Sequence, residues 1–96
     1  MNTDEVSERD FPVEKPTRQL VLFTIKQVFP EQDPAEVLAI LDLYGLEPYE
    51  RERERVQLAI LKLSEGNLNE LRDCVKLAKK DYRDVIAWAE YPDLRS

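Results

Sequence analysis

The last third of the chain carries a regular alternation of apolar residues, and no other feature constrains the fold as strongly. Apolar residues recur there at spacings of three and four, namely Leu68, Leu71, Val75, Ala78, Tyr82, Val85 and Ala89. This spacing is the seam of a heptad repeat, and it predicts one α-helix from Leu68 to about Glu90. At 1.5 Å per residue such a helix is about 34 Å long. Asp81, with Asp84 three residues on, is the one point where it could break.

Capping residues, prolines and glycines divide the preceding part of the chain into three shorter helices. Thr17 is a good N-cap for a helix over Arg18–Phe29, because Pro30 disfavours helical geometry in the residue before it. Apolar residues cover most of this helix, so we expect it to be buried on more than one side. Asp33 has the features of a second N-cap, and Gly45 can close the helix that it begins.

Pro48 predicts the start of the third helix, and Gly66 its end. Its first turns, residues 50–55, alternate Glu and Arg, which places opposite charges three apart but like charges four apart. We interpret this run as a solvated extension of the helix. Two apolar stripes follow and predict a central helix with neighbours on two sides. They are Val56, Ala59, Ile60 and Leu63, and then Leu58 and Leu61. Asn67 is predicted to cap the last helix.

These patterns predict an all-α domain, a four-helix orthogonal or irregular bundle with a long C-terminal helix. The β-branched segment Leu20–Ile25 could also form a strand, but no second strand exists to pair with it. We assign residues 17–92 to this domain, 1–16 to a flexible or extended leader, and 93–96 to a tail. The alternative for the leader is that Phe11-Pro12-Val13 docks on the body. The residues expected to be buried together are Leu41, Ile60, Leu71 and Val75.

Composition argues against several function classes. The chain has no His and one Cys, so the commonest general base is missing and a Cys-rich metal site cannot form. No apolar run approaches the roughly 20 residues of a membrane span. A net charge of −6 argues against general binding to nucleic acid or anionic lipid. We therefore expect a cytoplasmic, non-enzymatic protein with no metal and no cofactor.

Cys74 is interpreted as a buried or half-buried structural thiol. A small hydrolase or transferase is the opposing function class, and it would require Cys74 to be exposed, with a depressed pKa, beside Arg72 or Lys76. A third class is an acidic inhibitor or immunity-type protein that blocks a basic effector. The class we favour is a protein-interaction module that binds itself or an unidentified protein.

The last helix carries the candidate partner surface. Its cations fall at offsets of 4, 7, 8 and 11 from the first, on one helical face, and they are Arg72, Lys76, Lys79, Lys80 and Arg83. Its aromatic and apolar members are Tyr82, Val85, Trp88 and Tyr91. Three short helices cannot cover the whole seam, so we expect the part near Tyr82, Val85 and Ala89, with Trp88 alongside, to stay exposed and to form a two-fold homodimer. The alternatives are that the first helix or the leader covers this end, or that another partner binds there.

Two segments resemble known families. Residues 25–30 end in a Phe-Pro pair that resembles the pair after the first helix of the ubiquitin-binding CUE domain. That family has a di-leucine in its third helix, whereas this chain has Leu61-Lys62-Leu63, and its connection over residues 45–55 is longer. Residues 81–92, which include DYRDV and AEYP, resemble the tail of small bacterial helical proteins of unknown function. That resemblance implies a bacterial cytoplasmic setting and argues against ubiquitin recognition.

Overall fold

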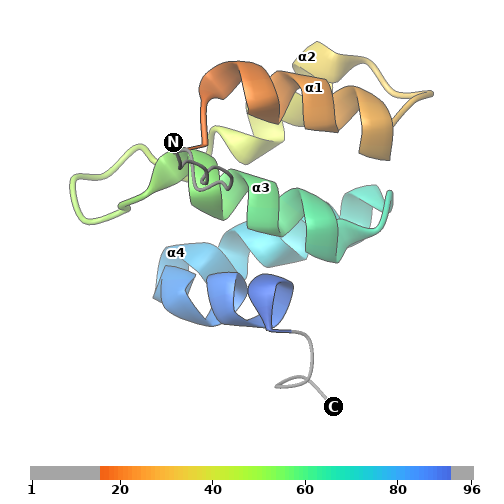
Figure 1. Cartoon of the computed structure of the whole chain (residues 1–96). Coiled ribbons are helices and arrows are strands. Elements are labelled where there is room, and N and C mark those ends of the chain that lie inside the picture. Colours follow the sequence, from red (N-terminus) through yellow and green to blue (C-terminus); the bar gives the residue numbers. More distant parts are fainter. Residues whose placement is uncertain (1–15, 92–96) are drawn as a thin grey trace, which may run out of the picture.

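The structure is a computed structural model that describes residues 16–91. Within this range the chain forms helices and no strand, so the predicted all-α fold with a long C-terminal helix is confirmed (Figure 1). The helices are α1 (Arg18–Val28), α2 (Pro34–Leu41), α3 (Arg53–Ser64) and α4 (Leu68–Glu90). The predicted docking of Phe11-Pro12-Val13 and the predicted tail lie outside the described residues.

Helix α3 lies at the centre of the bundle, with α1 against one side and α4 against the other (Figure 1). Its buried residues occupy both faces, which confirms the prediction of a central helix with two neighbours. Helix α2 packs against α1 and against α4. The four residues predicted to be buried together belong to one core cluster, so this prediction is also confirmed; they are Leu41, Ile60, Leu71 and Val75.

Three predicted N-caps are present. The side chains of Thr17, Asp33 and Asn67 each accept a backbone N–H from the first turn of the following helix, at 3.1, 3.0 and 3.0 Å respectively. Each cap satisfies a donor that has no partner inside its helix. The predicted start of α1, α2 and α4 therefore follows from local chemistry alone.

Helix α4 is broken at Asp81, at the one point where the sequence allowed a break. Asp81 has φ −156° and ψ 95°, outside the helical region, and its Oδ1 accepts the N–H of Arg83 at 3.1 Å. A short carboxylate side chain competes with the helix for nearby N–H groups and so begins a new helical turn. Helix α4 therefore has an N-terminal half, residues 68–80, and a C-terminal half, residues 82–90, and it is not the continuous helix that the seam predicted.

The prediction that α3 begins at Pro48 is wrong, because α3 begins at Arg53. The residue before it, Glu52, adopts a left-handed conformation with φ 52° and makes no side-chain cap. Helix α2 ends at Leu41 rather than at Gly45, and the chain continues through a turn in which Gly45 has φ 107°. Residues 42–52 are therefore a connection that is longer than the sequence predicted.

Helix α1 is buried on one side only, which corrects the prediction of burial on several sides. Val21 and Ile25 face the core, whereas Phe23 is 60% exposed. The reason is that α1 lies at the edge of the bundle, in contact with α2 and α3, and no other helix of residues 16–91 lies over its outer face.

Candidate protein-binding groove

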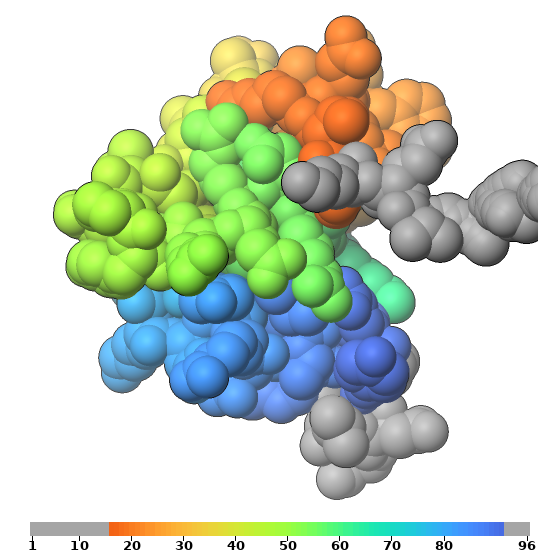
Figure 2. Space-filling view, turned by 60° about the vertical axis from the view of Figure 1, so that its left-hand side comes forward, coloured from red at the N-terminus to blue at the C-terminus, as the bar shows by residue number. Residues whose placement is uncertain are grey.

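An apolar groove of about 340 Å³ runs between the turn that follows α2 and the N-terminal half of α4. In Figure 2 the residues of the connection form a lobe that lies over α4. The lobe side of the groove includes Leu43 and Leu46, which are 52% and 67% exposed. Exposed apolar side chains that gather around a hollow are typical of a contact site. The full lining is Ile40, Leu43, Leu46, Arg72, Val75, Lys76 and Lys79.

Three cations of α4 form the rim of this groove. Arg72 and Lys76 are exposed and form no ion pair with any of residues 16–91. Lys79 differs, because its Nζ lies 2.7 Å from Glu50 Oε2 and donates to the carbonyl oxygen of Leu43 at 2.8 Å. The uncompensated positive charge beside the groove therefore comes from Arg72 and Lys76, on a chain whose net charge is −6.

Glu50 fixes the lobe that forms one wall of the groove. Its Oε1 accepts the backbone N–H groups of Gly45, Leu46 and Glu47 at 2.8, 3.0 and 3.3 Å, while Oε2 is paired with Lys79. The side chain is only 2% exposed. Burial disfavours the ionised carboxyl, but the hydrogen bonds from Lys79 and from these amides outweigh it and hold the pKa of Glu50 below its ordinary value.

The role of Glu50 corrects the prediction that residues 50–55 are a solvated helical extension. Its carboxylate caps the turn at residues 45–47, and this requires the chain to stay non-helical up to Glu52. Of the two predicted pairs three residues apart, the one between Glu52 and Arg55 is present at 3.2 Å. No ion pair joins Glu50 to Arg53, both of which lie in the described part of the chain.

Tyr44 anchors the far end of the same lobe. Its buried side chain donates a hydrogen bond from the hydroxyl to the carbonyl oxygen of Arg51 at 2.8 Å. Burial, and then the nearby charge of Glu50, raise the pKa of Tyr44 above its ordinary value. Its ring also lies near that of Tyr82, with centroids 6.5 Å apart. Tyr44 thus joins the start of the lobe to Arg51 near its end and also contacts α4.

The base of the lobe is anchored from below by Gln57 of α3. Its Nε2 lies within hydrogen-bond distance of the carbonyl oxygens of Leu41 and Tyr44, at 3.0 and 3.3 Å. It also contacts Asp42 Oδ1 at 3.1 Å, and Asp42 accepts two hydrogen bonds from Arg18 at 2.6 and 2.7 Å. The bonds from Arg18, opposed by burial, hold the pKa of Asp42 below its ordinary value.

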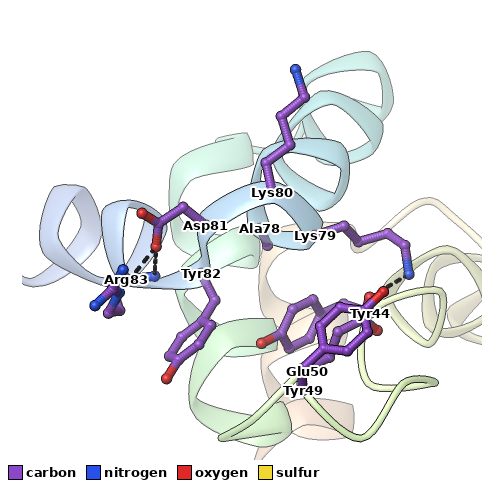
Figure 3. A pocket seen from close by; sticks show the side chains of 9 residues that line it. All are labelled: Tyr44, Tyr49, Glu50, Ala78, Lys79, Lys80, Asp81, Tyr82 and Arg83. Atoms are coloured by element: carbon purple, nitrogen blue, oxygen red, sulfur yellow. Dashed lines mark hydrogen bonds and ion pairs between the residues drawn. The ribbon is translucent and has the colours of Figure 1, made fainter.

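A second, polar pocket of about 230 Å³ also adjoins the Lys79–Glu50 pair (Figure 3). Figure 3 shows Lys79 extended toward Glu50 and Tyr44, whereas Lys80 points to the opposite side of the helix. Arg83 folds back on Asp81, with Nε 3.2 Å from Oδ1. Of the five cations that the sequence placed on one face, Arg83 alone lies beyond the break at Asp81.

The aromatic and apolar part of the predicted partner surface is only partly available. Val85 is fully buried and Ala89 is 2% exposed, so the prediction that this part of the seam stays exposed is wrong. Helix α3 packs against α4, and its Arg55 bonds Glu90 at 2.7 and 2.9 Å, beside this part of the seam. Tyr82 and Trp88 are half-buried, and Tyr91 is exposed.

Sequence reasoning missed Leu43, Leu46 and Glu50. The two leucines come after the apolar stripe of α2 and do not belong to its helical face. Apolar residues left over beside a predicted turn were therefore the one, weak, indication that they would be exposed. Glu50 gave no signal, because its partner Lys79 is 29 residues away in the chain. Long-range pairing of this kind is set by the packing of α4 and not by local sequence.

Other features of the described residues offer little for catalysis. Cys74 is half-buried and packs against the core, as the sequence predicted. Within residues 16–91, no three acidic or Cys side chains lie close enough together to hold a metal ion. Among the helices of the same range, none has both the length and the hydropathy needed to cross a bilayer. Comparisons with protein-family models, curated proteins and solved structures find no significant match to this chain.

Proposed function

We propose that this protein is a non-enzymatic helical interaction module, and that it binds a partner protein through the apolar groove between the lobe and α4. The observation that carries the proposal is the groove itself, where Leu43 and Leu46 stay more than half exposed on a wall that Glu50 holds in place. Leucines that a rigid wall holds in water add no apolar burial to the fold. At a contact site the same leucines are buried when a partner binds.

The chemistry of the lining favours protein binding over catalysis. Among the residues that line the groove there is no carboxylate, hydroxyl or thiol to serve as a nucleophile or base. An acidic inhibitor has weaker support at this site, because no Asp or Glu lines the groove and its rim cations would repel a basic effector. At the groove, Arg72 and Lys76 are the cations without an ion pair within the described residues, and two are too few for the strong phosphate binding of a nucleic-acid protein.

The test is comparative capture from a lysate of the cells that encode this chain, with quantitative mass spectrometry. Leu46→Asp places a charge in the groove at a side chain that is 67% exposed, so the fold should be retained. Phe23→Asp is the matched control, because Phe23 is also an exposed apolar residue, at 60%, but lies on α1. We expect proteins captured by the wild type and by Phe23→Asp to be lost from Leu46→Asp. Equal capture by all three proteins would refute the proposal.

A further inference from the structure

We infer that the segment that binds the groove is an acidic amphipathic helix of another protein. This inference rests on the proposed function and adds the chemistry of the partner. The charge of the rim is the first argument for it. Lys79 is balanced by Glu50, whereas Arg72 and Lys76 have no ion-pair partner among residues 16–91 and lie beside an apolar lining. A segment that buries apolar side chains in this groove must therefore present negative charge at its edge.

The spacing of the rim cations fits a helical partner. Arg72 and Lys76 are four residues apart on α4, which is about one turn or 6 Å along the axis. Carboxylates four residues apart on a second helix have the same separation. A helix laid along α4 can then place an apolar stripe in the groove and a carboxylate opposite each cation, which is the helix-in-groove mode of recognition.

The backbone of the groove wall argues against an extended partner. A strand binds by exchanging backbone hydrogen bonds with a free edge. Here the N–H groups of Gly45, Leu46 and Glu47 are already donated to Glu50, and the carbonyl oxygen of Leu43 accepts from Lys79. The other wall is a helix, whose backbone groups are paired internally. A partner must therefore satisfy its own backbone, as an α-helix does.

The test is a titration of the full, ¹⁵N-labelled chain with two synthetic helical peptides, followed by amide chemical shifts. Both peptides carry leucines at i, i+3, i+4 and i+7. The acidic peptide has Glu on the flanks of that stripe, and the basic peptide has Lys at the same positions. We expect the acidic peptide to give saturable shifts at the amides of Leu43, Leu46 and Lys76, and the basic peptide to bind at least about tenfold more weakly.

Charge reversal provides the control. The double variant Arg72→Glu with Lys76→Glu should reverse the preference, so that it binds the basic peptide and loses the acidic one. Lys80→Glu is matched to it, because Lys80 is also an exposed cation of α4 but points away from Lys79 (Figure 3). It should keep the wild-type preference. Because all three side chains are exposed, circular dichroism should show wild-type helix content in each variant.

Several outcomes would overturn the inference. Failure of the acidic peptide to bind, or equal binding of both peptides, would exclude charge recognition at the rim. If Leu46→Asp nevertheless loses its lysate partners, the proposed function stands and only the acidic helix is refuted. A wild-type dimer in sedimentation equilibrium that Leu46→Asp converts to monomer would replace the partner helix by a second copy. If deletion of residues 1–15 is needed before the peptide binds, the chain's own acidic leader is the occupant instead.

Discussion

The two halves of α4 bury apolar residues to a similar degree but differ in what covers them. The C-terminal half places Val85, Ile86 and Ala89 in the core, and its last residue, Glu90, is tied to Arg55 of α3. The N-terminal half buries Val75 but has the groove beside it. Within one apolar seam, the C-terminal half therefore serves the packing of the bundle, and the N-terminal half borders the candidate binding groove.

The difference follows from the length of α2. Helix α2 has eight residues and spans about 12 Å, so it covers only part of the N-terminal half of α4 before the chain turns away. The lobe continues the cover but leaves Leu43 and Leu46 exposed. Helix α3 also packs against α4, and its Arg55 bonds Glu90, which lies beyond the break at Asp81. A regular seam in the sequence thus marks which residues face the bundle, but not how completely the bundle covers them.

The largest expected effect is on the buried half. Val85→Glu would place an unpaired charge at a fully buried position, and we expect it to cost several kcal/mol and to unfold the domain. Leu46→Glu introduces the same side chain at an exposed position on the groove, and we expect a change within about 0.5 kcal/mol. Urea unfolding followed by circular dichroism measures both. Similar losses in the two variants would mean that the halves do not differ as described.

Local chemistry decides how much of this fold the sequence could predict. Thr17, Asp33 and Asn67 were predictable because a cap and the amide that it accepts lie within three residues of each other. Asp81 was identified as a break point for the same reason. The start of α3 was not predictable, because Glu50 depends on Lys79 in a distant helix. The groove was missed because it depends on how α2 and the lobe pack against α4. The apolar spacing of α4 predicts which residues face the bundle, but not where that packing leaves a hollow.

Glu50→Gln tests the wall of the groove and should have the next largest effect. The variant removes the charge that pairs with Lys79 but keeps an oxygen for the amides, so we expect a loss of about 1–3 kcal/mol at pH 7. Because the folded pKa is lowered, the stabilisation is present above the unfolded value of about 4.3 and is lost as the pH falls through the folded pKa. The difference in unfolding free energy between the two proteins, measured by urea titration, should therefore shrink as the pH falls below about 4.3.

Other carboxylates also contribute stability that is lost in acid. Glu50 therefore has to be tested by the difference in unfolding free energy between the wild type and Glu50→Gln. The pKa values of Asp42, Glu54 and Glu90 are lowered as well, and their contributions are common to the wild type and to Glu50→Gln. A difference in unfolding free energy between the two proteins that does not change from pH 7 to pH 3 would show that folding does not lower the pKa of Glu50.

Asp81→Ala tests the boundary between the halves. The variant removes the acceptor for the N–H of Arg83 and also restores a helix-favouring residue, so the two effects partly cancel. We expect faster hydrogen exchange at the amide of Arg83 and a smaller loss of stability than for Asp33→Ala. Asp33→Ala removes a cap with no such compensation and should cost about 1 kcal/mol. If Asp81→Ala proves the more damaging of the two, the break itself stabilises the bundle.

The smallest expected effect concerns the ion pair that closes the C-terminal half. The side chains of Arg55 and Glu90 are 40% and 38% exposed, so solvent screens their attraction, although two parallel hydrogen bonds hold them in a fixed geometry. A double-mutant cycle with Arg55→Ala and Glu90→Ala should give a coupling of about 0.2–1 kcal/mol. In 1 M salt, where the screening length is about 3 Å, the coupling should fall.

Lys76→Ala on the groove half should leave stability unchanged in either buffer, because Lys76 has no ion-pair partner within residues 16–91. If Lys76→Ala lost as much stability as Arg55→Ala, the charge of Lys76 would be part of the interactions that stabilise the fold. It would then not be available to bind a partner at the rim of the groove.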